Sequence, residues 1–259
     1  MEQLLAVDVG NTNIVLGLWR GEELAASWRL ATARDRTVDE YGILARQLVG
    51  AEGRIDAAVV ASVVPPLDSM IGEMLERTFG VQALFVEPGV RTGLSIRTEN
   101  PLEVGADRIV NAVAAHEQFD GSVIVVDFGT ATTFDLVTGR GEYCGGLIAP
   151  GLTVSAEALF TRAARLPRVD IRKPAHLIGT NTIGSLQSGL YYGYLGLIDG
   201  VLERMKNEVP SIGTVVATGG IPKSFIEESR HIEQWDPELT LKGLRIVHER
   251  NRSHRGKRR

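Results

Sequence analysis

The strongest constraint on the fold of this chain is a pattern that occurs twice. The stretch "AVDVGNTNIVLG", residues 6–17, is an apolar run with an acid and a glycine at its end, followed by polar residues and a second apolar run. The stretch "VVDFGTATTFDL", residues 125–136, repeats it, with Asp127 in the place of Asp8 and Gly129 in the place of Gly10. Apolar, β-branched runs separated by Gly and polar residues are typical of strand–turn–strand units. The repeat therefore predicts a duplicated protein whose halves each begin with an acid-bearing hairpin.

The segments after each hairpin support the duplication. Helix and strand patterns alternate after the first hairpin, and Thr37 and Glu40 form a predicted capping box at the start of the first helix. The run "VVAS", residues 59–62, is echoed by "VVAT", residues 215–218. We expect an α/β protein with an N-terminal half at 1–118, a C-terminal half at 119–247, and a cleft between two mixed sheets.

Charge and composition indicate the cellular compartment and the classes of binding partner. The net charge is −4, but residues 248–259 carry six Lys or Arg and one Glu, which leaves −9 on the rest of the chain. We expect this basic tail to be disordered and solvated, with a nucleic-acid-binding arm as the alternative. The net charge of −4 gives no indication of a nucleic-acid partner. The single cysteine, the absence of a signal-peptide pattern and the absence of a long apolar run predict a cytoplasmic protein without a membrane partner.

The repeated hairpin suits phosphate binding. A tight turn can direct backbone N–H groups to one point, and Thr12, Asn13, Thr130 and Thr132 add side-chain donors. An acid at the strand end would repel a bare phosphate, but it can hold a hydrated Mg²⁺ that bridges to the phosphate. Asp8 is the candidate for this role. The alternative interpretation is that each hairpin is an ordinary turn without a ligand. The occurrence of the acid at the same place in both copies favours phosphate binding over this alternative.

A second candidate site lies in "GADR", residues 105–108, where a predicted helix begins. An acid in the first turn is favoured by the helix dipole whatever its function, so Asp107 could be only a helix-terminal residue. However, a carboxylate that accepts a hydroxyl proton, beside a guanidinium that binds a carboxylate, suits a hydroxy-acid substrate. Asp107 and Arg108 are therefore candidates for substrate activation and binding.

Several motifs together resemble the type III pantothenate kinases, in the superfamily of acetate and sugar kinases, Hsp70 and actin. They are "DVGNTNIVLG", "NPLEVGADRIVNA", "VVDFGTATTFD", "GGLIAPG", "NTIGSLQSG" and "ATGGIP", and the resemblance extends from Leu4 to about Val247. It implies a duplicated actin-like (ribonuclease H-like) fold and ATP-dependent phosphorylation of pantothenate to 4'-phosphopantothenate, the first step of coenzyme A biosynthesis. It also implies a homodimer, Mg²⁺, and activation by K⁺ or NH₄⁺.

The resemblance assigns roles to individual residues. Asp107 would be the catalytic proton acceptor, Gly105, Ala106, Arg108 and Thr182 would bind pantothenate with it, and Asp127 would hold the monovalent cation. Gly219 and Gly220 suit a close backbone approach to the adenine or ribose. The expected ATP-binding residues are Asp8, Val9, Gly10, Asn11, Thr12, Asn13, Ile14, Val15, Thr130, Gly219 and Gly220.

Some alternatives stay open at this point. Thr182 could equally be the N-cap of the long helix that follows it, and the aromatic stripe at residues 191–197 fits core packing and a dimer interface equally well. Thr98 stands where many family members have a substrate-contacting Tyr, so another aromatic residue could line that wall. A family member that has lost catalysis and acts as a regulatory or binding protein, and a phosphatase of the same superfamily, are the alternative functions.

Overall fold

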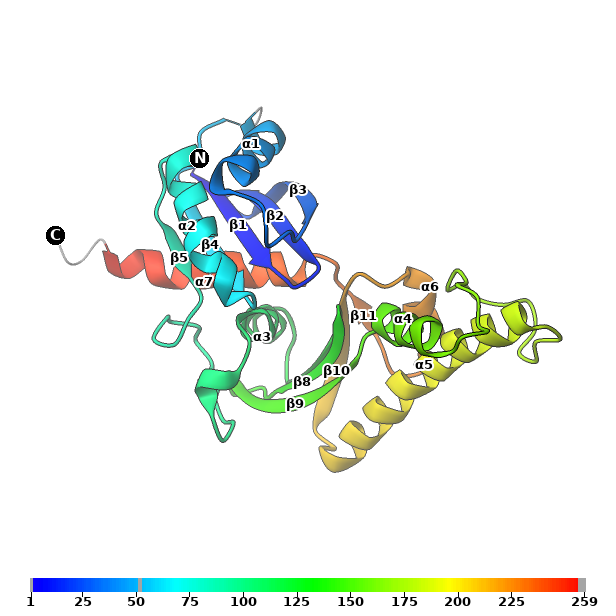
Figure 1. The fold of residues 1–259 in the computed structure, drawn as a ribbon. Helices are drawn as coiled ribbons and strands as arrows, with labels where there is room; N and C mark the ends of the chain where they lie inside the picture. The colour runs from blue at the N-terminus through cyan, green and yellow to red at the C-terminus, as the bar shows by residue number, and fades with distance from the viewer. Residues whose placement is uncertain (1, 51–52, 256–259) are drawn as a thin grey trace. The chain divides into compact units, whose positions relative to one another are not determined.

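A computed structural model describes residues 2–50 and 53–255 (Figure 1). The chain divides into two compact units. The first comprises Met1–Gln118, Gly141–Tyr143 and Glu238–Arg259, and the second comprises Phe119–Arg140 and Cys144–Pro237. Each unit combines strands with helices, which confirms the mixed α/β class. The division into halves at 1–118 and 119–247 stays a prediction. The first compact unit also includes Gly141–Tyr143 and the C-terminal segment from Glu238, which lie after residue 118 in the sequence.

The sheet of the first unit has the strand order β3-β2-β1-β4-β5. β1 is antiparallel to β2, and β2 to β3, which gives the expected meander, whereas β4 is parallel to β1. Parallel neighbours bring their carboxyl ends to the same edge of a sheet, so Val9 lies beside Ser62 there. The strands span Gln3–Val9 (β1), Asn13–Arg20 (β2), Glu23–Ala31 (β3), Ala57–Ser62 (β4) and Ala83–Phe85 (β5).

Helices α1 (Val38–Val49) and α2 (Pro65–Phe79) cover one face of this sheet. Alternate side chains of β1, including Val7 and Val9, pack with them into one buried apolar cluster. The predicted capping box of α1 is confirmed. The Thr37 hydroxyl accepts a hydrogen bond from the Glu40 backbone N–H, and the Glu40 carboxylate accepts one from the Thr37 N–H at 2.7 Å.

Helices α3 (Ala106–Gln118) and α7 (Leu239–Arg255) cover the opposite face. A Cβ on Gly243 would lie 1.9 Å from the carbonyl oxygen of Val110, so only glycine permits this approach of the two helices. The structure differs here from the expected disordered tail at residues 248–255, which belong to α7, while residues 256–259 of that tail lie outside the described residues. The reason is that Leu244 and Val247 are buried in the same helix, and this apolar side anchors the basic residues that follow.

The second sheet has the strand order β11-β10-β7-β8-β9-β6. β7 is antiparallel to β8 and parallel to β10, as β1 is to β2 and β4, so both hairpins have the same surroundings. The strands span Ser95–Ile96 (β6), Ser122–Phe128 (β7), Ala131–Val137 (β8), Glu142–Pro150 (β9), Ile212–Gly219 (β10) and Gln234–Trp235 (β11). β6 pairs with the part of β9 that belongs to the first unit.

The long helix α5 (Thr182–Glu208) and the short helix α6 (Lys223–Glu228) provide much of the second core. Tyr191 and Tyr194, from the aromatic stripe, are 1% and 6% exposed and lie in this core, which favours the packing interpretation for these two residues. The remaining elements are a 3₁₀ turn η2 (Pro101–Glu103) and α4 (Leu152–Arg162).

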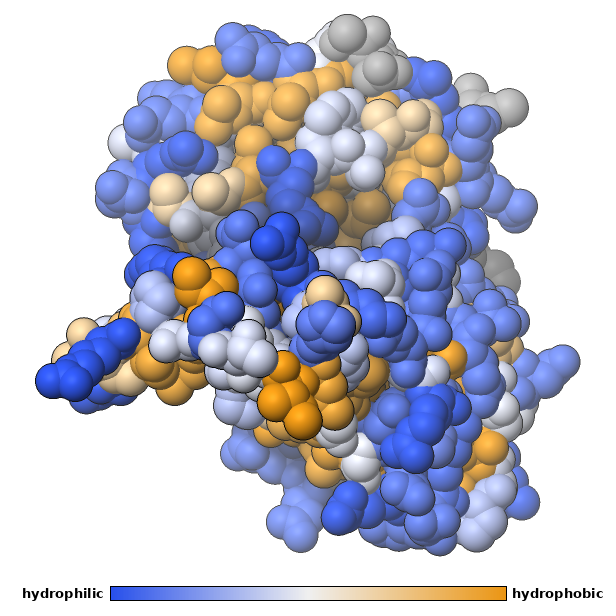
Figure 2. Space-filling view, turned by 90° about the vertical axis from the view of Figure 1, so that its right-hand side faces the viewer, coloured by the Kyte–Doolittle hydropathy of each residue, from blue (hydrophilic) through white to orange (hydrophobic). Residues whose placement is uncertain are grey.

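Some large apolar side chains are nevertheless exposed in the second unit, and Figure 2 shows apolar surface between polar areas. They come from the end of β9, from α4, and from the start of α5 with the loop before it: Leu147, Ile148, Val154, Leu159, Leu177, Ile178 and Ile183. Within residues 2–50 and 53–255, no helix has the length and apolar character needed to cross a membrane.

Candidate active site

The first hairpin turn is braced by the end of β3. The Gly10 N–H donates to the carbonyl oxygen of Asn13 at 2.9 Å, and the Thr32 hydroxyl donates to the carbonyl oxygen of Gly10 at 2.7 Å. The Arg34 guanidinium donates to the Asn11 side-chain oxygen at 3.2 Å. Asn11 and Thr12 are exposed at the tip. The Gly10 N–H closes the turn in this structure, so the side chains and amides at the tip are the better candidates to contact a phosphate.

The second hairpin turn is one residue shorter. Asp8 pairs across its hairpin with Val15, seven positions on, whereas Asp127 pairs with Thr133, six positions on. The Gly129 N–H is again used to close the turn, through a 3.0 Å hydrogen bond to the carbonyl oxygen of Ala131. The two turns therefore present different residues at their tips, although the acids and glycines align in sequence.

Asp8 lies at the carboxyl end of β1 on the face that α3 and α7 cover. Its neighbours Val7 and Val9 point into the cluster under α1 and α2, so alternation along the strand directs Asp8 to the other side. The Asp8 side chain is half-buried. A carboxylate at a strand end and beside an exposed turn is suitably placed to bind a cation that also contacts a phosphate.

The "GADR" segment meets the same edge of the first sheet. The Val63 N–H donates to the carbonyl oxygen of Val9 at 3.0 Å, and a Cβ on Gly105 would lie 3.4 Å from the Val63 side chain. That Cβ would also lie 2.5 Å from the Asp107 carboxylate, so the glycine makes room for the acid. The structure thus brings the ends of β1 and β4 and the start of α3 together within one unit.

Asp107 and Arg108 occupy the first turn of α3, and both are half-buried. The Asp107 carboxylate accepts a hydrogen bond from the Arg108 backbone N–H at 2.7 Å. Such a bond satisfies one of the N–H groups that a helix leaves unpaired at its start. Asp107 therefore has a local structural role at the start of α3, in a position that is half-buried.

Arg108 has an aromatic neighbour that sequence reasoning missed. Its guanidinium carbon lies 5.9 Å from the ring centroid of Tyr143, which is fully buried in β9. The Arg97 N–H donates to the carbonyl oxygen of Tyr143 at 2.8 Å, so the strand that carries the ring pairs with the segment leading to Thr98. The Thr98 hydroxyl oxygen is buried and has no hydrogen-bond partner within the described part of the chain. In the sequence, the stretch "YCGG", residues 143–146, shows only an aromatic residue shortly before two glycines, and this pattern does not indicate a contact with Arg108.

In the second unit, Asp127 lies beside the turn formed by Gly219 and Gly220. A Cβ on Gly219 would lie 2.6 Å from the Asp127 carboxylate, and Gly219 has a φ of 96°, where other residues are strained. The Gly220 N–H donates to the carbonyl oxygen of Phe128 at 2.8 Å. The structure therefore brings the predicted cation ligand and the predicted nucleotide turn together.

Another glycine, absent from the sequence-based candidates, supports the second hairpin. The Gly151 N–H donates to the carbonyl oxygen of Thr130 at 3.1 Å, and a Cβ on Gly151 would lie 2.5 Å from that oxygen. The turn is thus fixed against the segment between β9 and α4, while the Thr130 residue itself remains exposed. The "APG" stretch was a recognisable turn in the sequence, but nothing there indicated which element it would meet.

Thr182 is not the N-cap of α5. Asn181 holds that position, and its side-chain oxygen accepts a hydrogen bond from the Gly184 N–H at 2.9 Å. Thr182 is the first helical residue and is exposed. It belongs to the second unit, whereas Asp107 and Arg108 belong to the first.

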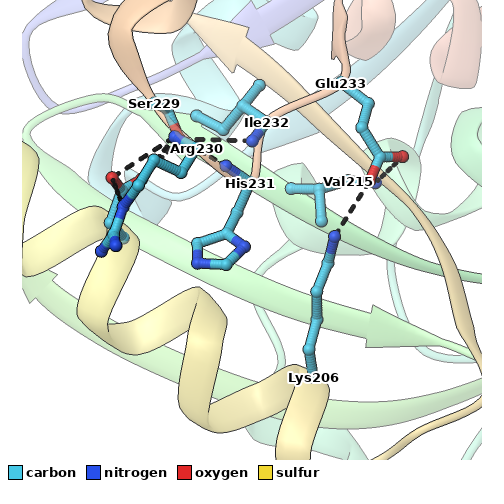
Figure 3. Close-up of polar contacts among 8 residues, drawn as sticks. Lys206, Val215, Ser229, Arg230, His231, Ile232 and Glu233 are labelled. Atoms are coloured by element: carbon cyan, nitrogen blue, oxygen red, sulfur yellow. Dashed lines mark hydrogen bonds and ion pairs between the residues drawn. The ribbon is translucent and has the colours of Figure 1, made fainter.

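The segment that follows α6 is fixed to α5 and β10, as Figure 3 shows. The buried Asp199 accepts hydrogen bonds from the Ser229 hydroxyl at 2.7 Å and from the Arg230 side chain at 3.2 Å. Lys206 pairs with Glu233 at 2.9 Å. These contacts anchor the chain after the Gly219–Gly220 turn, so the turn lies between two fixed elements.

A tyrosine–carboxylate pair joins α5 to α6. The Tyr191 hydroxyl donates to Glu228 at 2.7 Å, and Lys173 pairs with the same carboxylate oxygen at 3.1 Å. Burial, and then the Glu228 carboxylate, raise the pKa of Tyr191 to about 12. The hydrogen bond from Tyr191 in turn lowers the pKa of Glu228. This network keeps α6 in position next to the turn.

Comparison with known protein sequences identifies close relatives of the chain. The family model for type III pantothenate kinase matches residues 4–204. The type III pantothenate kinase of Geobacter sulfurreducens is 53% identical over 253 residues, covering 96% of this chain and 99% of that protein. The corresponding protein of an Anaeromyxobacter species is 55% identical, covering 96% of this chain and all of that protein.

Solved structures with the same fold are more distant in sequence. A Baf family transcriptional activator from Campylobacter jejuni superimposes with a TM-score of 0.60 at 21% identity, covering 96% of this chain and 99% of that one. A ROK family glucokinase from Streptomyces griseus, solved with glucose and AMPPNP, has a TM-score of 0.55 at 14% identity, covering 97% and 99%. These likenesses concern the fold and confirm the expected sugar-kinase and actin-like class. The sequence matches, which include both hairpins and the "GADR" segment, show that the chain belongs to the type III pantothenate kinase family.

Proposed function

We propose that this protein is a kinase that transfers the γ-phosphoryl group of ATP to the hydroxyl of pantothenate, the first step of coenzyme A biosynthesis. The observation that carries this proposal is the identity of more than half of the residues, over nearly the whole chain, with relatives named type III pantothenate kinase. The regulatory and phosphatase alternatives have no comparable support, since the names of these relatives point to neither.

Phosphoryl transfer requires positioning and charge neutralisation more than covalent chemistry by the protein. In the proposed reaction, the pantothenate hydroxyl oxygen attacks the γ-phosphorus, the bond to the β–γ bridging oxygen breaks, and ADP leaves. Asp107 orients the hydroxyl and accepts its proton, and Arg108 holds the substrate carboxylate. Gly105 supports this arrangement because its missing Cβ leaves space for the Asp107 carboxylate. Thr182 is a further proposed pantothenate contact.

The nucleotide end is assigned to residues 8–15 and to Thr130, Gly219 and Gly220. Asp8 would hold Mg²⁺, which neutralises phosphate charge when bound. The donors present fit this ion, since Mg²⁺ in kinases is held by one or two carboxylates together with phosphates and water. No group of three or more His, Cys, Asp or Glu side chains is close enough to form a protein-only metal cage in the described residues.

Asp127 is the proposed ligand of a monovalent cation, K⁺ or NH₄⁺. Its half-buried carboxylate lies at a strand end beside the Gly219 turn, where a positive charge would offset both the acid and a nearby phosphate. The shorter second hairpin supports a separate role from that of Asp8, because its tip presents other residues at a different offset from the acid.

A homodimer is also part of the proposal. The exposed apolar residues of the second unit include Ile148, Leu177 and Ile178, which are 66%, 65% and 81% exposed. Contiguous exposed apolar surface often marks an interaction site. On α5, Gly189, Gly193 and Gly196 have open space where a Cβ would be, which would permit close packing of a second helix.

The decisive test of the kinase activity is ADP release by the purified protein with ATP and Mg²⁺, in the presence and absence of pantothenate. We expect ADP release only when pantothenate is present. Equal release without pantothenate would favour an ATP- or phosphate-hydrolysing role, and no release in either case would favour a binding protein. Either of these results would overturn the proposed function.

A further inference from the structure

We propose that Tyr143 positions the Arg108 guanidinium to receive the substrate carboxylate, an inference that rests on the proposed function. Arg108 is the predicted carboxylate ligand, and its guanidinium carbon lies 5.9 Å from the centroid of the Tyr143 ring. A cation within about 6 Å of an aromatic face is attracted by the electron-rich ring. Both residues belong to the first compact unit.

The ring is itself held in place. Tyr143 is 0% exposed, and it pairs with Ile96 between β9 and β6. The residues beside this pair add a second tie, since Arg97 donates from Nε to Glu142 at 3.0 Å. On the other side, a Cβ on Gly141 would lie 3.0 Å from the His116 ring, so β9 begins directly against α3. Tyr143 is therefore a fixed platform next to the helix that carries Arg108.

A fixed platform affects substrate binding because arginine side chains are long and lose rotamer freedom when they bind a ligand. Attraction to a ring face uses the charge of the guanidinium, whereas a carboxylate is bound by the N–H donors in its plane. The same cation can therefore interact with the ring and with a substrate carboxylate. Pre-organisation of this kind should act on pantothenate affinity and much less on ATP affinity.

The test compares Tyr143→Leu with Tyr143→Phe in steady-state kinetics of the whole protein. Phe keeps the ring, so the pantothenate KM should stay near that of the wild type, whereas Leu should raise it about 2- to 30-fold, the range expected for cation–π contacts. The ATP KM should stay near that of the wild type in both variants. Melting temperatures report whether each variant is folded, and Tyr143→Met replaces the Leu variant if the latter does not fold.

A double-mutant cycle with Arg108→Gln, which removes the cation that the ring attracts, separates positioning from general packing. If Tyr143 acts through Arg108, the variant with both Tyr143→Leu and Arg108→Gln should have a pantothenate KM no higher than that of Arg108→Gln alone. Independent, multiplying effects would overturn the inference, and so would a Phe variant as impaired as the Leu variant. A wild-type protein without pantothenate-dependent ADP release would overturn the proposed function and this inference together. Normal wild-type turnover with an unchanged KM in the folded Leu or Met variant would overturn this inference alone.

Discussion

The Asp127 carboxylate and the α-carbon of Gly219 are so close that a Cβ on the glycine would lie 2.6 Å from a carboxylate oxygen. The two residues are far apart in sequence, and the parallel pairing of β7 with β10 brings them together. The strand end that carries the acid and the turn that follows β10 therefore form one compact corner, to which we assign the nucleotide and a monovalent cation.

Replacement of Gly219 by Ala should disturb this corner. The φ of 96° is unfavourable for Ala by about 1–3 kcal/mol, and the new Cβ would meet the Phe128 carbonyl oxygen at 2.5 Å. We expect a lower free energy of unfolding and an ATP KM raised about tenfold, which corresponds to ~1.4 kcal/mol of lost binding. Gly213→Ala, on the same strand, is the control, because its Cβ would meet only ordinary contacts at 3.7 Å and beyond. Equal ATP KM values in both variants would remove Gly219 from the nucleotide site.

Replacement of Asp107 by Asn should reduce kcat by about 10²- to 10⁴-fold, the usual effect of losing a general base. The amide oxygen can still accept the hydrogen bond from the Arg108 N–H, so the fold should be preserved. Single-turnover rates and circular dichroism of the same sample measure both properties. A folded variant with the wild-type kcat would show that the acid serves only the helix start.

The cation assignment predicts a specific ionic response. At constant ionic strength, activity should rise with K⁺ or NH₄⁺ and much less with Na⁺ or Li⁺, since general screening is then unchanged. Asp127→Asn should weaken this activation because the amide keeps the shape of the side chain and loses its charge. A K⁺ titration of both proteins provides the measurement. Full wild-type activity in buffer free of K⁺ and NH₄⁺, or an unaltered response in the variant, would refute the assignment.

The two hairpins and the start of α1 could be predicted from the sequence because their determinants are local. The apolar runs, the strand-end acids and the glycines specify hairpins through nearest-neighbour chemistry, and Thr37 and Glu40 specify a helix start in the same way. The sequence did not predict that the second turn is one residue shorter than the first. The acids and glycines of the two hairpins align, but the residues that pair with the acids on the following strands do not. The sequence offered Thr182 as a possible N-cap of α5. The N-cap is Asn181 instead, because the helix already begins at Thr182.

Other features depend on contacts between distant segments. Nothing around Tyr143 indicates that its ring meets Arg108, because the contact requires β9 to start against α3. The C-terminal segment was expected to be disordered on account of its charge. Within the described part of this segment, Arg250 instead pairs with Glu117. Asn251 binds the backbone of Arg91 through both its side-chain oxygen and its amide nitrogen.

This C-terminal contact gives a stability prediction. Asn251→Ala removes partners from the Arg91 N–H and carbonyl groups, which are exposed, and should lower the free energy of unfolding by about 0.5–1.5 kcal/mol. Glu249→Ala, on the same helix, removes an exposed pair with Arg245 and should cost only about 0.5 kcal/mol or less. Urea denaturation of both variants makes the comparison. Similar decreases in the free energy of unfolding of the two variants would indicate that the Asn251 hydrogen bonds do not stabilise the packing of α7 against residues 91–94.

The burial of the Tyr191 hydroxyl, together with its hydrogen bond to Glu228, predicts a pH dependence. The folded pKa of Tyr191 is raised to about 12, above the value near 10 of an unfolded tyrosine. Stability from this group is therefore complete below pH 10 and is lost as the pH rises toward about 12. Tyr191→Phe should be less stable at neutral pH but should lose less stability across this window. Tyr192→Phe is the control on the neighbouring residue, and identical pH profiles for the Tyr191 variant and the wild type would contradict the prediction.

The central claim is tested most directly by identifying the product of a reaction with ATP, Mg²⁺ and pantothenate by mass spectrometry while ADP is quantified in the same sample. The proposed function predicts one molecule of ADP for each molecule of pantothenate that gains a single phosphoryl group. ADP formation without phosphorylated pantothenate, or at the same rate when pantothenate is omitted, would contradict it.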